Sequence, residues 1–112
     1  MGTRSRIVLD RSENFKACNL MSMYCHYDGY MEYTGKMLLD KYNDEIKVEY
    51  LITHVGGYAS CLKETKEQTK EESVHNDPMQ YFDSEEELMD CCDNSDLEFI
   101  YLFKNGVWYV SQ

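Results

Sequence analysis

The stretch LEFIYLFKNGVWYV, residues 97–110, decides the fold class of this chain. Two runs rich in aromatic and β-branched residues flank Asn105-Gly106, the dipeptide that type I′ hairpin turns favour. The turn pairs residues across the two strands, and one face is predicted to carry Phe103 opposite Trp108 and Tyr101 opposite Val110. The other face is also apolar and carries Ile100, Leu102 and Tyr109. We therefore expect two central strands of a sheet that helices cover on one side.

A second hairpin is predicted at the start of the chain. Residues 3–10 (TRSRIVLD) and 20–28 (LMSMYCHYD) alternate with the period of a strand, and the polar residues 11–19 join them. A connection centred near Lys16 places Arg6 opposite His26 and Arg4 opposite Asp28.

Two helices are expected next. Residues 31–42 contain helix formers with Leu38, Leu39 and Tyr42 as the buried stripe. Asn43 is expected to cap a second helix, with Asp44 and Glu45 in its first turn. The predicted buried positions of this second helix, spaced i, i+3, i+4, i+7, are Val48, Leu51, Ile52 and Val55. Gly56-Gly57 ends it.

The remaining segments complete a ββαα(β)αββ order. Residues 58–62 are read as a short strand, and residues 63–80, rich in Lys, Glu and Thr, as an exposed loop. Ser84 and Glu87 form a capping-box pattern for a helix that runs to about Cys92. The prediction is a single α+β domain over residues 1–112, with an antiparallel sheet of four or five strands and helices packed on one side.

Charge is distributed unevenly along the chain. The net charge is −10; residues 1–63 hold eight basic and eight acidic residues, whereas residues 64–112 hold three basic and thirteen acidic. Such a field repels nucleic acid and attracts basic surfaces. The residues proposed to contact a basic partner are Glu85, Glu86, Glu87, Asp90, Asp93 and Asp96. The alternative is that these carboxylates only keep a small protein in solution.

Cysteine and histidine spacing argues against a metal site or a disulfide framework. The five cysteines are odd in number, two are adjacent, and none forms a CxxC pair; the three histidines are far apart. We expect small buried thiols in a reducing compartment, and no cofactor. No apolar run approaches the roughly 18 residues that span a bilayer, so a cytoplasmic protein without membrane contact is predicted.

One polar face groups the candidate ligand-binding residues. Strand parity puts two guanidiniums, an imidazole, a carboxylate and a phenol on one side of the N-terminal hairpin, and two more polar residues follow it directly. The set is Arg4, Arg6, Tyr24, His26, Asp28, Tyr30 and Lys36. Arginine forks suit phosphate or carboxylate. The competing interpretation is an Arg–Asp ion pair that only holds the hairpin together.

A catalytic role has less support in the sequence. Cys25 and His26 are neighbours on a strand and point to opposite faces, so they cannot form a dyad. His26 and Asp28 share a face and would make an oriented general base, but no nucleophile accompanies them at a recognisable spacing. No catalytic residue is assigned.

Several segments together resemble a family of small hypothetical proteins common in bacteriophages and prophages. They are GTRSRI (2–7), YCHYDGY (24–30), GKMLLDKY (35–42), a GG–S–L segment (56–62) and the YLF–NG–W hairpin (101–108). The most specific parts are Thr3-Arg4-Ser5 and residues 26–30; members often have Pro after the last tyrosine, where this chain has Met31. The resemblance implies a phage accessory gene, and such genes often counter host immunity.

Three functions follow as hypotheses. The first is a non-enzymatic phage inhibitor of a bacterial defence protein, anti-CRISPR-like, which presents its acidic C-terminal half to a basic groove in the host cytoplasm. The second is a sponge that sequesters an immune signalling nucleotide through Arg4, Arg6, His26 and Asp28. The third is a small hydrolase with His26 as base. Direct nucleic-acid binding is not expected. Whether the chain forms a homo-oligomer is left open.

Overall fold

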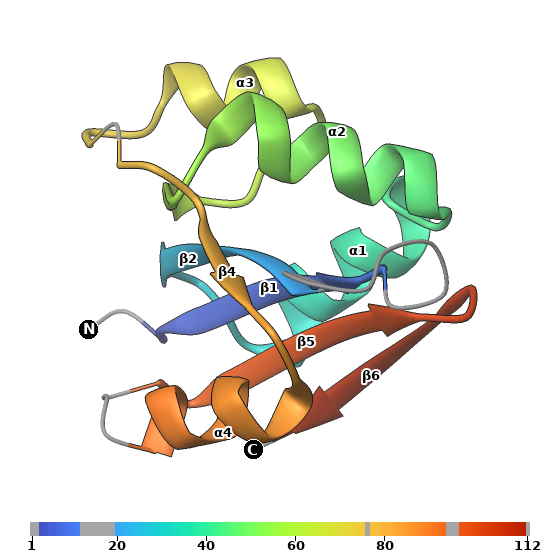
Figure 1. Ribbon diagram of the computed structural model, residues 1–112. Coiled ribbons are helices and arrows are strands. Elements are labelled where there is room, and N and C mark those ends of the chain that lie inside the picture. The colour runs from blue at the N-terminus through green and yellow to red at the C-terminus, as the bar shows by residue number, and fades with distance from the viewer. Residues whose placement is uncertain (1–2, 12–19, 76, 94–96, 112) are drawn as a thin grey trace.

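The computed structural model describes residues 3–11, 20–75, 77–93 and 97–111, and it confirms the α+β class. Within these residues six strands form one open sheet with helices on both faces (Figure 1). The strands are β1 (Ser5–Asp10), β2 (Leu20–Tyr27), β3 (Tyr58–Cys61), β4 (Gln80–Phe82), β5 (Phe99–Lys104) and β6 (Val107–Ser111). The helical segments are η1 (Met31–Gly35), α1 (Lys36–Lys41), α2 (Glu45–Val55), α3 (Lys66–Glu71) and α4 (Glu85–Asp93).

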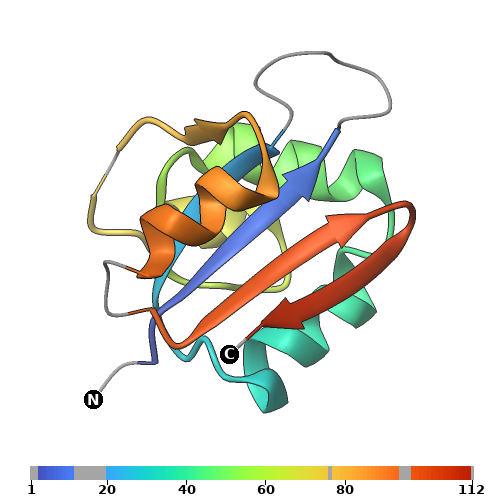
Figure 2. The same cartoon turned by 60° about the horizontal axis from the view of Figure 1, so that its bottom comes forward.

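The sheet is mixed, so the prediction of a purely antiparallel sheet was wrong. The strand order is β3-β2-β1-β5-β6, and β4 pairs with β2 as well. β1 runs parallel to β5 and β2 runs parallel to β3, whereas the pairs β1–β2, β2–β4 and β5–β6 are antiparallel. The two parallel pairs join strands that are distant in the chain and linked by helical crossovers, which hairpin signals do not report. Figure 2 shows β1, β5 and β6 side by side.

The C-terminal hairpin is confirmed residue by residue. Asn105 and Gly106 have φ angles of 54° and 79°, as a type I′ turn requires. Phe103 pairs with Trp108 and Tyr101 with Val110. Only β5 is central, however, because β6 ends the sheet.

The N-terminal hairpin forms in a register two residues away from the predicted one. Arg6 lies opposite Tyr24 and Ser5 opposite Cys25, so Arg6 is not the partner of His26. A shift of two residues keeps every side chain on its predicted face, because the period of a strand is two. The connection that was used to set the register, around Lys16, lies outside the described residues.

Helix α2 covers one face of the sheet as predicted. Its four predicted apolar residues are all buried, and they pack on Ile7, Leu9, Met21, Met23 and Phe103. Asp44, and not Asn43, is the N-cap, since its carboxylate accepts a hydrogen bond from the Lys47 amide at 2.8 Å. The helix ends at Gly56, whose φ of 92° favours glycine.

The first predicted helix is confirmed in place and partly wrong in its buried stripe. It begins with the π-type turn η1 and continues as α1. Leu38 and Tyr42 are buried against the sheet, but Leu39 is 62% exposed. Adjacent residues of a helix point about 100° apart, so Leu39 points away from the face that Leu38 buries.

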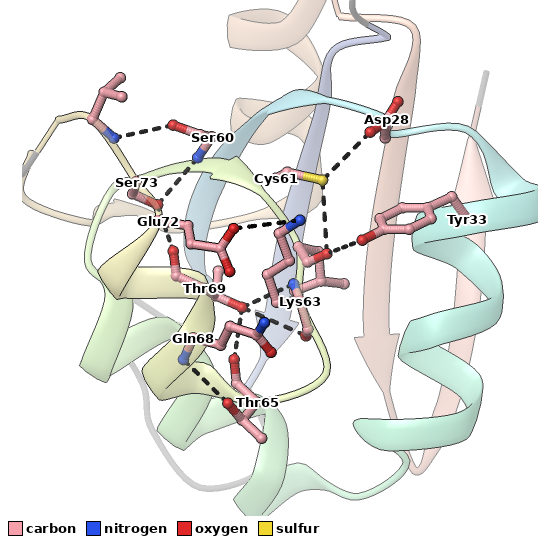
Figure 3. A network of polar contacts seen from close by, with 12 residues as sticks. Asp28, Tyr33, Ser60, Cys61, Lys63, Thr65, Gln68, Thr69, Glu72 and Ser73 are labelled. Carbon is pink, nitrogen blue, oxygen red and sulfur yellow. Dashed lines mark hydrogen bonds and ion pairs between the residues drawn. The ribbon is translucent and has the colours of Figure 1, made fainter.

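Residues 63–75 and 77–80 are folded, which corrects the prediction of a loop, whereas most of these residues are exposed as predicted. They contain α3 and the start of β4. The Thr65 hydroxyl caps α3 by accepting from the Gln68 amide at 3.1 Å, and Thr69 is fully buried. Figure 3 shows that the Thr69 hydroxyl also binds the backbone of Lys63, which anchors α3 beside β3.

Helix α4 packs on the opposite face of the sheet from α2 and α3 (Figure 1), so helices do not cover one side only. Its Leu88 and Cys92 join Val8, Leu20 and Leu102 in a second buried cluster. β5 is apolar on both faces and Val8 of β1 lies beside it, so this second face also needs a cover. The Ser84 hydroxyl accepts from the Glu87 amide at 3.2 Å, as the capping-box pattern predicts.

Candidate functional site: a cationic hollow beside helix α4

A hollow of about 500 Å³ opens on the same face of the sheet as α4, where β1, β2 and β3 lie side by side. Its lining residues are Arg4, Arg6, Tyr24, His26, Tyr58, His75 and Leu97. The structure thus brings together four of the seven predicted ligand-binding residues. Alternation along β1 and β2 puts their side chains on this face, and the antiparallel register places Arg6 and Tyr24 side by side.

Arg6 is held rigidly at the base of this hollow. Its Nη1 donates to the Ser22 hydroxyl at 3.0 Å, and that hydroxyl donates to the carbonyl of Gln80 on β4 at 3.1 Å. Burial lowers the pKa of the guanidinium from its usual value, although arginine stays charged in proteins. Its Nε is buried and has no hydrogen-bond partner among the described residues. A partly desolvated guanidinium that lines a hollow attracts anions strongly.

Aromatic rings form the wall of the hollow opposite the arginines. Tyr24 Oη and His26 Nδ1 are 2.8 Å apart, which fixes both rings. Tyr58 lies 5.7 Å from Tyr24 between ring centroids, and His75 meets Tyr58 edge-to-face at 4.8 Å. Burial raises the pKa of the Tyr24 phenol, with Arg4 opposing that shift, so the phenol stays a neutral donor at physiological pH.

The described lining of the hollow differs in charge from the chain as a whole. The chain has a net charge of −10, yet the hollow's described lining contains two arginines, two histidines and two tyrosines, without a carboxylate. Cationic side chains set close together in a partly desolvated site attract anions more strongly than they would in water.

Asp28 does not belong to this site, which corrects its predicted place on the polar face. Its φ of 56° turns the backbone and ends the alternation of β2. Figure 3 shows its carboxylate beside Cys61 at the end of β3, where the thiol donates to it at 3.5 Å. The pair His26–Asp28 that a general base would require is therefore not formed.

Tyr30 and Lys36 are also separate from the hollow. Tyr30 precedes η1, and its carbonyl accepts from the Thr34 amide at 2.9 Å. Lys36 lines a different, apolar hollow together with Leu39 and Trp108. The predicted convergence of all seven residues was wrong, because it extended strand parity past the end of β2.

Sequence reasoning missed Tyr58 and His75. Tyr58 pairs with Tyr24 across the parallel β2–β3 contact, so both rings point to the same face. His75 follows α3 and is positioned by the bond from the Val74 amide to the Ser60 hydroxyl, at 3.1 Å. Neither contact has a local sequence signal; only the β3 prediction over residues 58–62 pointed to this neighbourhood.

The predicted partner-binding carboxylates lie on or near α4. Glu85 pairs with Lys104 at 2.9 Å, and the Glu87 carboxylate accepts from the Asp83 amide at 3.1 Å. Glu86 and Asp90 are exposed on the helix. Asp93 is the last residue of α4, and Asp96 lies outside the described residues. The acidic residues of α3 lie across the sheet from α4 (Figure 1), so the C-terminal half does not present one continuous acidic surface.

None of the helices in the described part of the chain has the length and apolar character that crossing a bilayer requires. Comparison of the chain with protein-family models, with curated proteins and with solved structures gave no significant match. The conclusions about function therefore depend on the geometry of this hollow and on the surface chemistry around it.

Proposed function

We propose that this chain is a non-enzymatic binding protein that holds a nucleotide in the cationic hollow and thereby sequesters it. The observation that carries the proposal is the pairing of Arg4 and Arg6 with an aromatic wall in the described lining, which has no carboxylate. Guanidiniums suit the phosphate, and aromatic rings suit a flat base.

Arg6 supports a phosphate in preference to a weakly charged ligand. Its guanidinium is already fixed by Ser22, so little side-chain entropy is lost when an anion binds. The guanidiniums of Arg6 and the neighbouring Arg4 would bind the phosphate through charge-assisted hydrogen bonds, which are worth about 1.5–3 kcal/mol each.

The side chains favour ligand binding over catalysis. His26 shares a hydrogen bond with Tyr24 and not with a carboxylate. Burial raises the pKa of the Cys25 thiol to about 12 and also raises that of Cys61, which makes both poor nucleophiles. The resemblance to phage proteins extends the proposal: the sequestered ligand would be a signalling nucleotide of a bacterial defence system.

A capture experiment tests this proposal. The purified chain is mixed with a bacterial small-molecule extract, washed and denatured, and the released molecules are identified by mass spectrometry. About one nucleotide per chain is expected from the wild type and far less from the Arg4→Ala/Arg6→Ala variant. Release of no phosphorylated molecule, or equal release from both proteins, would refute it.

Inhibition of a defence protein through the acidic helix α4 is the second candidate function. The observation in its favour is that α4 exposes Glu86 and Asp90 on a helix whose other face is buried in the sheet. A basic groove on a host protein, as in the anti-CRISPR-like hypothesis, would complement this surface.

Charge reversal distinguishes a docking role for α4 from an acidic surface that is only solvated. Glu86→Lys/Asp90→Lys should slow association with a partner recovered from host lysate, whereas Glu64→Lys/Glu71→Lys changes the net charge equally on the other side of the sheet. Equal effects of the two variants would mean that only net charge matters, and would remove α4 as a docking helix.

A further inference from the structure

Strand β6 leaves one edge of the sheet open. It pairs with β5 on its inner side, and within the described residues no other segment hydrogen-bonds to its outer side. The other edge is closed differently. On β3 the Ser60 amide donates to the Ser73 hydroxyl and the Val74 amide donates to the Ser60 hydroxyl, both at 3.1 Å (Figure 3).

The residues of β6 lack the devices that normally protect an edge strand. Its sequence, VWYVS, has no charged residue and no proline, in a chain in which 29% of residues are charged. Val107, Tyr109 and Val110 are 50%, 52% and 45% exposed. Edge strands are usually blunted by lysine, proline or a bulge, because open backbone groups recruit another strand.

The turn determines which backbone groups of β6 are open. A two-residue turn makes its flanking pair, Lys104 and Val107, a hydrogen-bonded pair, and hydrogen-bonded positions then alternate along the strand. Val107, Tyr109 and Ser111 therefore bond to β5. The N–H and C=O groups of Trp108 and Val110 point away from the sheet.

We propose that two copies of this chain associate by antiparallel pairing of their β6 strands about a two-fold axis at Tyr109. This register sets Trp108 opposite the second copy's Val110, and the reverse, so both open residues exchange N–H···O=C bonds with their counterparts. It is the symmetric register that uses all the open groups of Trp108 and Val110 while keeping the strands fully overlapped. The two sheets become one continuous sheet.

The surroundings of β6 fit a second copy better than a charged partner. On the helix side, Trp108 and Val110 border an apolar hollow of about 260 Å³ that Met31 and Leu39 also line. Leu39 is 62% exposed and Met31 is 40% exposed, so the second strand would cover apolar surface. On the other side Lys104 neutralises Glu85, which lets two chains of charge −10 approach here.

Sedimentation velocity over a concentration series tests this dimer. We expect the sedimentation coefficient to rise with concentration toward a dimer value. Val110→Pro removes an outward N–H without breaking a bond to β5 and should leave a monomer, as should Val110→Lys. Val110→Thr keeps the N–H and the branched shape, and Val74→Lys adds the same charge at a remote exposed valine; both should dimerise like the wild type.

A cross-link tests the register. Tyr109→Cys places two thiols directly opposite each other at a non-hydrogen-bonded position, where Cβ atoms are about 4.5–5.5 Å apart. Mild oxidation should yield a disulfide-linked peptide that joins residue 109 to itself, whereas Ser111→Cys should not link to itself. A wild type that stays monomeric at every concentration, or a dimer that survives Val110→Pro in a folded protein, would overturn the proposal. Links that map to the exposed Cys91 instead of residue 109 would do the same.

Discussion

Tyr24 and His26 lie two residues apart on β2, and their side chains meet on the same face of the sheet, with 2.8 Å between Oη and Nδ1. This contact uses one ring nitrogen of the histidine and leaves Nε2 as the atom available to a ligand. The orientation of His26 in the cationic hollow is therefore determined by a phenol and not by a carboxylate.

Loss of that phenol should weaken ligand binding without unfolding the protein. Tyr24→Phe removes one hydrogen bond, typically about 0.5–1.5 kcal/mol, and so should lower nucleotide affinity roughly 2–12-fold. Tyr50→Phe on α2 is the control, because Tyr50 is 55% exposed and far in the fold from β2's polar face. Calorimetric titration measures both; equal affinities for the two variants would show that Tyr24 does not position the site.

Replacement of Arg6 by lysine should show how much of the ligand affinity depends on the planar guanidinium and how much on its charge. Lysine keeps the positive charge but lacks the planar fork that Ser22 holds in place, so Arg6→Lys should reduce affinity about tenfold or more. Arg11→Lys is the matched control, since Arg11 pairs with Glu49 at 3.5 Å on another part of the sheet. Unchanged affinity in Arg6→Lys would mean that the fork makes no contact with the ligand.

Glycine at position 29 should be required for the close approach of the segment after β2 to Thr3 and Ser5. An alanine Cβ there would lie 2.5 Å from Ser5 Oγ and 2.7 Å from the carbonyl oxygen of Thr3. Tyr101 Oη also donates to the Gly29 carbonyl at 2.6 Å, so the segment cannot easily move away. Gly29→Ala should lower the free energy of unfolding by about 1–3 kcal/mol.

The control for this change is Gly35→Ala, where the nearest heavy atoms lie at 3.4 Å and the backbone is helical. Its effect should stay within about 1 kcal/mol. Urea denaturation compares the two variants. A Gly29→Ala protein as stable as Gly35→Ala would show that the contact with Thr3 and Ser5 is not tight in solution.

Stability should fall steeply in alkali. Burial raises the pKa of Tyr42 to about 12, so the folded state keeps a proton that the unfolded state releases near pH 10. The stabilisation is complete below pH 10 and is lost as pH rises toward 12. Tyr42→Phe loses the bond to the Lys63 carbonyl but should show a shallower decline of the urea midpoint between pH 9 and 11. An identical decline in wild type and variant would contradict the assignment.

Local signals explain which parts of the fold were predictable. Asn105-Gly106 determines its own turn, and the register of the C-terminal hairpin follows from it. The spacing of Val48 and Leu51 likewise reports their burial, because one helix carries both residues. The parallel contact of Ile7 with Tyr101 brings together distant parts of the chain, and no pattern within either strand reveals it.

The candidate site was predictable only as far as strand parity holds. Arg4, Arg6, Tyr24 and His26 were placed correctly on one face, since alternation is a property of each strand alone. Asp28 left that face because its left-handed backbone ends the strand. Tyr58 belongs to β3 and His75 to the segment after α3, so their presence in the hollow depends on tertiary contacts.

Isothermal titration of the wild-type chain with a panel of linear and cyclic nucleotides, alongside the corresponding unphosphorylated nucleosides, tests the central claim most directly. The cationic hollow predicts saturable heat at about one nucleotide per chain, weakened by salt and much reduced for the nucleosides. No heat with any nucleotide of the panel, or a nucleoside that binds as tightly as its phosphate, would contradict it.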